Sequence, residues 1–417
     1  MIQSKHGNQA GIPIQILSER ELVRTFGSAR FVYNHFLRLR TDAWFNEQKR
    51  LNYNDTSSLL TRLKRDPEFT WLSEVSSVPV QQSLRHLQTA FGNFFAKRAG
   101  YPSFHCKRGP QSVTYVATGF TFDQDARKLT LAKMEEPLNI RWSRTIPKKA
   151  KATSVTVSRD SANRYFISIL CDDQVEQLAE SSKKIGIDMG LNHFLITSDS
   201  EKVTAPNLYR KFEKKLQRLQ RQQARKMETA KLAAGISKGK AIPKGVKIPK
   251  SKNWLKDQMK INRVHAKITD ARRDFQHKLS TRLIRENQTI SLETLAVKNM
   301  SRSAKGTEDK PGRMVKQKSG LNKSILDASW SEFIRQLEYK ASWYGRKIIG
   351  IDRWYPSSKR CSSCGFVLKE LSLKNRSWSC PECGVHHDRD INAARNILAA
   401  GLAVSALGEQ VSPGVCA

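Results

Sequence analysis

The first hundred residues carry apolar positions that recur at helical intervals. Five of them fall three or four positions apart and so share one helix face: Leu22, Phe26, Ala29, Val32 and Phe36. Similar patterning continues to about residue 100. It predicts a helical domain over 18–100. The preceding segment, 1–17, is weakly patterned and is compatible with one short strand.

After the break GYPSFHCKRG (100–109), apolar and polar residues alternate in short runs separated by turn-rich sequence. The runs are SVTYVA (112–117), KLTLA (128–132), SVTVS (154–158) and RYFISIL (164–170). Alternation with a period of two is typical of half-buried strands. We therefore predict a β-rich module over 101–180, built as a small barrel or sandwich.

From residue 181 onward, short apolar strands are mixed with long amphipathic helices. The strand-like runs are KIGID, HFLITSD, TISLE and KIIGI. Periodic apolar residues predict two helices within an insertion at 201–287, and a third helix from Leu326 to Tyr344 after a basic loop at 301–322. This mixture predicts an α/β domain over 181–358, which makes the whole chain a multidomain α+β protein.

The charge of the chain narrows the class of partner. A formal net charge of +35, from 73 Lys+Arg against 38 Asp+Glu, favours a polyanion, and nucleic acid suits it best. Neither a run of 18 apolar residues nor a signal peptide is present, so we expect a cytoplasmic protein. The excess is greatest in 201–280, where candidate phosphate contacts include Lys211, Lys214, Lys215 and Arg218.

Four of the seven cysteines form two closely spaced pairs. Cys361 and Cys364 are separated by two residues, and Cys380 and Cys383 follow with the same spacing after a gap of fifteen. Four thiolates satisfy tetrahedral Zn²⁺ and leave no position open, so the spacing predicts a structural zinc ribbon over 359–385. The adjacent His386 and His387 are expected to be polar neighbours of this site. Unpaired cysteines elsewhere argue against a disulfide framework and for a reducing compartment.

Three acids stand where strands end or a helix begins. Asp188 closes the run IGID, Glu293 follows TISL, and Asp390 opens an alanine-rich helix. Carboxylates are ligands that Mg²⁺ prefers, and paired metal ions can activate water and stabilise a departing phosphodiester oxygen. Taken singly, each of the three acids is weak evidence. Glu293 alone could be a surface acid at a strand end. An aspartate at a helix start is most often a simple N-cap, which is the role that we expect for the neighbouring Asp388.

Several ordered blocks together resemble the TnpB family of transposon-associated RNA-guided DNA endonucleases, which are related to compact type V CRISPR effectors. The blocks are TFGSARFVYNHFL (25–37), GYPSFHCK (100–107), GIDMGLNHFLITSD (186–199), DFQHKLSTRLI (274–284), YPSSKRCSSCG (355–365) and HDRDINAARNI (387–397). They span most of the chain. The start departs from the family pattern, because MIQSKHGNQAGIPIQIL matches the usual KxYKFRLYPT strand poorly, which indicates a truncated or degenerate strand.

The resemblance implies roles for these parts. Asp188, Glu293 and Asp390 would be the acids of an RNase H-like (RuvC) nuclease centre that holds two Mg²⁺ ions. The nuclease domain would consist of 181–358 and, after the ribbon, its last segment and the C-terminal tail at 386–417. The helical segment would contact the guide–target heteroduplex, and 101–180 would be a wedge domain. RNA from the end of the protein's own transposon would supply the guide. Base pairing with this guide would then read the double-stranded DNA target beside a short flanking motif. Lys359 and Arg360, at the start of the ribbon beside Cys361, would help to neutralise phosphates.

Three other functions remain open from the sequence. An RNase H-like transposase would also need three carboxylates, but it would have to recognise transposon ends. No clear helix-turn-helix stands out for that task, although the helices of 18–100 do not exclude one. A non-cleaving RNA-guided binder or repressor is disfavoured by an intact set of acids. A zinc-ribbon nucleic-acid adaptor would leave those acids unexplained. We expect a prokaryotic, nucleoid-associated nuclease encoded by an insertion sequence.

Overall fold

The computed structural model describes residues 4–12, 16–143, 145–147, 149–173, 175–307, 309–372 and 374–406. Residue contacts divide the chain into two compact units, Met1–Gln174 and Val175–Ala417. Each unit is described by itself. Among the described residues, no helix is both long enough and apolar enough to cross a membrane.

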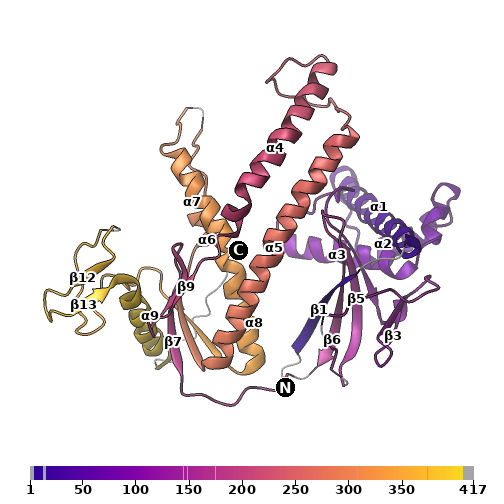
Figure 1. The fold of residues 1–417 in the computed structure, drawn as a ribbon. Coiled ribbons are helices and arrows are strands. Elements are labelled where there is room, and N and C mark those ends of the chain that lie inside the picture. The colour runs from indigo at the N-terminus through magenta and orange to yellow at the C-terminus, as the bar shows by residue number, and fades with distance from the viewer. Residues whose placement is uncertain are drawn as a thin grey trace. The chain divides into compact units, whose positions relative to one another are not determined.

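The first unit contains the predicted helical segment. Its elements are α1 (Ile16–Glu47), α2 (Tyr53–Leu63), the short 3₁₀ helix η1 (Pro67–Ser73) and α3 (Ser77–Phe95) (Figure 1). The five apolar residues predicted to share one face of the first helix are all buried. The face is divided between two cores: Leu22, Phe26 and Ala29 pack against the strands of this unit, and Val32 and Phe36 pack against α2 and α3.

The strands of the first unit form an antiparallel sheet in the order β1-β6-β5-β2. These strands are β1 (Ser4–Ile12), β2 (Gln111–Val116), β5 (Lys151–Arg159) and β6 (Tyr165–Asp173), and a separate hairpin joins β3 (Phe120–Asp123) to β4 (Lys128–Leu131). The predicted barrel is corrected here: residues of β2 to β6 share one core, but the described strands do not close into one hydrogen-bonded ring. The predicted N-terminal strand is confirmed as β1, although 1–3 and 13–15 lie outside the described residues.

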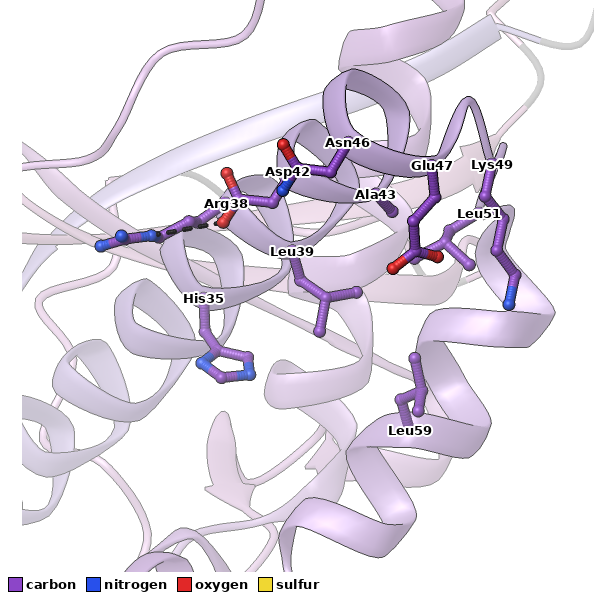
Figure 2. Close-up of a pocket in the computed structure, with 10 residues that line it drawn as sticks. All are labelled: His35, Arg38, Leu39, Asp42, Ala43, Asn46, Glu47, Lys49, Leu51 and Leu59. Atoms are coloured by element: carbon purple, nitrogen blue, oxygen red, sulfur yellow. Dashed lines mark ion pairs between the residues drawn. The ribbon is translucent and has the colours of Figure 1, made fainter.

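A cavity of about 470 Å³ opens between α1 and α2 (Figure 2). Its lining mixes charged and apolar side chains: His35, Arg38, Leu39, Asp42, Ala43, Asn46, Glu47, Lys49, Leu51 and Leu59. Arg38 and Asp42 form an ion pair of 3.5 Å along its rim. None of the predicted site residues lines this cavity, so it takes no part in the site described below.

The second unit is built on a five-stranded mixed sheet in the order β11-β10-β7-β8-β9. The strands are β7 (Lys184–Asp188), β8 (His193–Thr197), β9 (Lys202–Thr204), β10 (Thr289–Glu293) and β11 (Lys347–Ile351). β7 runs parallel to β10 and β10 parallel to β11, while β7, β8 and β9 pair antiparallel. The parallel strands therefore end at one common edge.

Helices cover both faces of this sheet. Ile185 and Ile187 of β7 share a core with residues of α5 (Lys252–Glu286) and α8 (Trp330–Tyr344). Gly186 faces the opposite way, because side chains alternate along a strand. There it meets α9 (Arg389–Ala406) so closely that an added Cβ would lie 2.1 Å from the carbonyl oxygen of Ala394. Figure 1 shows α9 beside β7.

Three further helices, α4, α6 and α7, lie in the described part of the second unit. α4 (Leu208–Ala233) packs along α5 through a small apolar core, as the amphipathic patterns in the insertion predicted (Figure 1). The basic loop predicted for 301–322 is wrong in its second half, where α7 (Val315–Ala328) begins after the short α6 (Val297–Met300). The helix predicted from Leu326 to Tyr344 is also divided, because Ser329 has a positive φ of 54° and separates α7 from α8.

Candidate active site and metal centre

The sheet brings two of the three predicted acids to the same edge. Leu292 of β10 pairs with Ile187 of β7, so that Glu293 and Asp188 occupy the next positions of the parallel register. Leu292 and Ile187 point into the core under α5 and α8. By alternation, the side chains of Glu293 and Asp188 point to the opposite face of the sheet, which α9 covers.

α9 carries the third acid, Asp390, in its first turn. Asp388 fixes where this helix begins, because its Oδ1 accepts hydrogen bonds from the backbone N–H of Asp390 and of Ile391, both at 3.1 Å. The N-cap predicted for Asp388 is thereby confirmed. Burial works against the charge of Asp388, but these bonds and Lys202, whose Nζ lies 2.6 Å from Oδ2, outweigh it and lower its pKa.

The three carboxylates act on one another electrostatically. Burial, followed by the negative charges of Glu293 and Asp390, raises the pKa of Asp188 to about 7, against the opposing charge of Arg389. The pKa of Glu293 is also raised by burial, and a hydrogen bond from Ser357 partly offsets this effect. A cation placed among these groups would remove their repulsion, and hard oxygen donors are the ligands that Mg²⁺ prefers.

A hydroxyl that the sequence did not single out orients one of these acids. Ser357 is buried and its Oγ donates to Oε1 of Glu293 at 2.6 Å. Two asparagines of α9, Asn392 and Asn396, are buried as well, and both donate to the carbonyl oxygen of Arg360, at 2.7 and 2.6 Å. Asn396 also donates to the Ser357 carbonyl at 2.8 Å. The helix that carries Asp390 therefore holds the loop that orients Glu293.

The four predicted cysteine ligands come together. The sulfur atoms of Cys361, Cys364, Cys380 and Cys383 all lie within 4.8 Å of one another and could hold a metal ion. Over the ranges that the structure describes, no other group of three or more His, Cys, Asp or Glu side chains is gathered this tightly, so the three carboxylates are more widely spaced. Two short strands, β12 (Ser377–Ser379) and β13 (His386–Asp388), pair beside the cysteines.

The chemistry of this cluster fits a divalent cation such as zinc. Burial opposes ionisation of Cys361, but backbone N–H groups and His387 outweigh burial and lower the pKa of that thiol to about 5. At Cys364 a backbone N–H favours the thiolate, yet desolvation and the neighbouring sulfurs raise the pKa to about 12. Four thiolates cannot ionise together in this space without a positive charge among them.

His387 lies next to the cysteines as a polar neighbour. Its Nε2 is 3.0 Å from Sγ of Cys361, and its ring packs 4.8 Å from that of Trp378, centroid to centroid. The ribbon is also attached directly to α9, because Asn392 Oδ1 accepts from the backbone N–H of Ser362 at 2.9 Å. The buried side chain of Asn392 thus links the folding of the ribbon to the position of Asp390, which lies on the same helix.

The predicted phosphate contacts divide into two groups. Lys211, Lys214, Lys215 and Arg218 are exposed along α4. Lys359 and Arg360 are half-buried, and Nζ of Lys359 donates to the carbonyl oxygen of Lys369 at 3.0 Å. The α4 side chains are therefore available to a polyanion, whereas Lys359 already has a partner within the ribbon.

Family models match three parts of this chain. They are described as "Cas12f1-like, TNB domain" over 330–397, "Probable transposase" over 244–304 and "Helix-turn-helix domain" over 18–49. The first covers α8, β11, the ribbon and the start of α9, which includes the cysteines and Asp390. The segment matched as a helix-turn-helix lies almost wholly within the single continuous helix α1.

Relatives match nearly the whole chain. A protein of Streptomyces pristinaespiralis named "Putative RNA-guided DNA endonuclease" is 47% identical, over 94% of this chain and 88% of its own length. A protein of Escherichia coli K12 named "Putative RNA-guided DNA endonuclease InsQ" is 38% identical, over 95% of this chain and 92% of its own length. The solved complex of Cas12f1 with its guide RNA and target DNA shares the fold, with a TM-score of 0.52 at 16% identity, covering 91% of this chain and 82% of that one. Mimivirus proteins named TnpB-like also match, at 31% identity over 39% of this chain. The chain therefore belongs to the TnpB family, together with these proteins named as RNA-guided DNA endonucleases.

Proposed function

We propose that this protein is an RNA-guided, Mg²⁺-dependent endonuclease that cuts double-stranded DNA beside a short flanking motif. The observation that carries the proposal is the convergence of Asp188, Glu293 and Asp390 on one face of one sheet edge, within electrostatic range of one another. The family's named activity and the basic exposed face of α4 support it. In this reading the second unit is an RNase H-like (RuvC) domain, and the strands of the first unit are a wedge domain.

The residues of the chain have distinct tasks in this proposal. Asp188, Glu293 and Asp390 would hold Mg²⁺, which would supply an activated water and stabilise the departing oxygen. Ser357 keeps the Glu293 carboxylate in one orientation through its 2.6 Å hydrogen bond. Arg389 eases the ionisation of Asp188 that metal binding requires.

The remaining parts would bind and position nucleic acid. Cys361, Cys364, Cys380 and Cys383 would hold structural Zn²⁺ and so brace the start of α9. Lys211, Lys214, Lys215 and Arg218 would neutralise phosphates of the guide RNA or the target, so binding should weaken steeply with salt. With DNA as its substrate the protein would be found at the nucleoid, and an insertion sequence would encode it.

The decisive experiment uses the full chain purified with RNA transcribed from its own locus. Matched duplex DNA carrying a randomised flank is offered with Mg²⁺, and cut ends are sequenced. We expect cutting at the matched target beside one preferred flank, and none by Asp188→Ala. Absence of cutting across the whole library would refute the nuclease, and full cutting by Asp188→Ala would refute the site.

A second function, transposase activity on transposon ends, is favoured by one observation. The family model that matches 244–304 is described as a transposase. The same reactions distinguish it, since a transposase would join the cut ends to a second DNA molecule, whereas the proposed nuclease releases them. A repressor that binds without cutting would retain the matched DNA and leave it intact.

A further inference from the structure

Trp354 is the most exposed of the large hydrophobic residues in the part of the chain that the structure describes, with 82% of its surface accessible. A singly exposed apolar residue is common on protein surfaces and needs no explanation by itself. The position of this one makes it informative, because it lies in the loop that joins β11 to the cysteine ribbon, at the edge of the sheet that carries the acids.

Contacts to the acidic edge flank Trp354 on both sides. Three residues before it, Ile351 pairs with Glu293 in the parallel register, and its carbonyl oxygen accepts from Oγ1 of Thr294 at 2.9 Å. Three residues after it, Ser357 donates to the carboxylate of Glu293 at 2.6 Å. At roughly 3.5 Å per residue, the Cα of Trp354 lies within about 11 Å of the Cα atoms of Ile351 and Ser357.

The loop between these contacts is held in a defined turn. Asp352 Oδ1 accepts from the backbone N–H of Trp354 at 2.6 Å, and the Asp352 carbonyl accepts from Tyr355 N–H at 3.2 Å. The backbone N–H of Ser357 then donates to the Tyr355 carbonyl at 2.7 Å. The indole is thus presented to solvent from a fixed backbone, so a ligand would not have to order the loop first.

The surroundings of the indole suit a nucleotide better than a protein partner. The guanidinium carbon of Arg353 lies 5.9 Å from the centre of the Trp354 ring, and Asp352 and Arg353 are both exposed. An indole with a cation over one face can stack a base on its other face, and the cation can neutralise the attached phosphate. A protein interface would need a wider apolar patch than one ring among charged residues.

We propose that Trp354 is a nucleobase-stacking residue that holds an unpaired nucleotide of the DNA strand beside the carboxylates. The proposal rests on the proposed nuclease function and adds to it a residue that binds the substrate strand. Bases inside a duplex are already stacked on one another and cannot offer a free face. The strand must therefore be melted where it is cut.

The first test measures binding without any cutting. Full-length Asp188→Ala protein is titrated at elevated salt, where phosphate contacts are weakened, with a short single strand that contains the fluorescent base 2-aminopurine. We expect quenching of the base, and about tenfold weaker binding with loss of quenching when Trp354→Ala is added. Trp354→Phe should keep most of the affinity. Leu326→Ala, which removes an exposed apolar side chain on α7, should bind like its parent.

The proposal is overturned if Trp354→Ala binds the single strand as tightly, and quenches it as strongly, as its parent. It is also overturned if the same sequence binds equally tightly as a duplex and this binding depends on Trp354. This assay requires no guide and no metal, so it remains readable if RNA-guided cutting fails. In the Asp188-containing protein with guide RNA and Mg²⁺, Trp354→Ala should slow single-turnover cutting about tenfold and leave guide RNA binding unchanged. An unchanged rate would count against the proposal even if the nuclease itself were established.

Discussion

Replacing Asp188 with asparagine should stabilise the metal-free protein, and should do so increasingly as the pH rises. The carboxylate is half-buried next to Glu293 and Asp390, and its pKa is raised from 3.8 to about 7. In the unfolded chain it ionises near its ordinary value. Between these two pH values the folded protein therefore binds a proton that the unfolded chain has lost. Folding becomes less favourable as the pH increases through this window, and the loss is complete above the folded pKa.

The magnitude follows from the difference between the two pKa values. From 3.8 to about 7, at about 1.4 kcal/mol per pKa unit, the full cost of ionising Asp188 in the folded protein is about 4 kcal/mol. At pH 5 only the part between 3.8 and 5 has been lost, which is about 1.5 kcal/mol. Asparagine keeps the shape and carries no charge. The advantage of Asp188→Asn should thus grow from about 1.5 kcal/mol at pH 5 to about 4 kcal/mol at pH 8.

The assay is urea unfolding of the metal-free full chain at pH 5 and pH 8, followed by tryptophan fluorescence. Asp309→Asn is the matched control, because Asp309 is an exposed acid in the loop before α7, and its substitution should change stability little at either pH. Mg²⁺ should then raise the stability of the unsubstituted protein at pH 8 and have much less effect on Asp188→Asn. If the stability difference between Asp188→Asn and the parent is the same at both pH values, the pKa of Asp188 is not raised in the folded protein.

Three other substitutions or treatments have defined outcomes. Gly186→Ala forces a Cβ against the backbone of α9 and should destabilise the protein by about 3 kcal/mol in thermal or urea unfolding, whereas Gly320→Ala, in an open position on α7, should be neutral or slightly stabilising. Ser357→Ala removes the hydrogen bond that lowers the pKa of Glu293, so the pH profile of cutting should move to higher pH and the rate at neutral pH should fall about tenfold, with Ser357→Thr restoring it. Cys361→Ser, or a strong chelator, should remove the bound zinc detected by atomic absorption and lower the melting temperature; an unchanged zinc content would contradict the four-cysteine site.

The features that the sequence predicted well are those that depend on local pattern. Strands with clear alternation or apolar runs were found to within about three residues at each end. The four cysteines were found from their spacing, and the N-cap role of Asp388 from its position before a helix. The catalytic roles of Asp188, Glu293 and Asp390 stay predictions, which the sheet register makes geometrically reasonable.

The features that the sequence did not predict depend on contacts between distant residues. Ser357 and Glu293 are 64 positions apart, and nothing near either one indicates their hydrogen bond. Gly186 reads as part of a strand, and only the position of α9 shows why a side chain cannot be accommodated there. The start of α7 at Val315 was missed because KQKSG is polar and contains a glycine, so it resembles a loop.

The placement of Asp390 at the start of α9 also fixes when the site can exist during synthesis. Asp390 follows Asp188 by about 200 positions, so at about 5–20 residues per second the nascent chain carries the first acid for about 10–40 s before the third is made. Throughout that interval the sheet has no α9 over the face at Gly186. A chain released early by the ribosome would keep the basic helix α4, for which we propose affinity for polyanions, yet lack the third carboxylate. Incomplete copies would then compete for nucleic acid without being able to damage it.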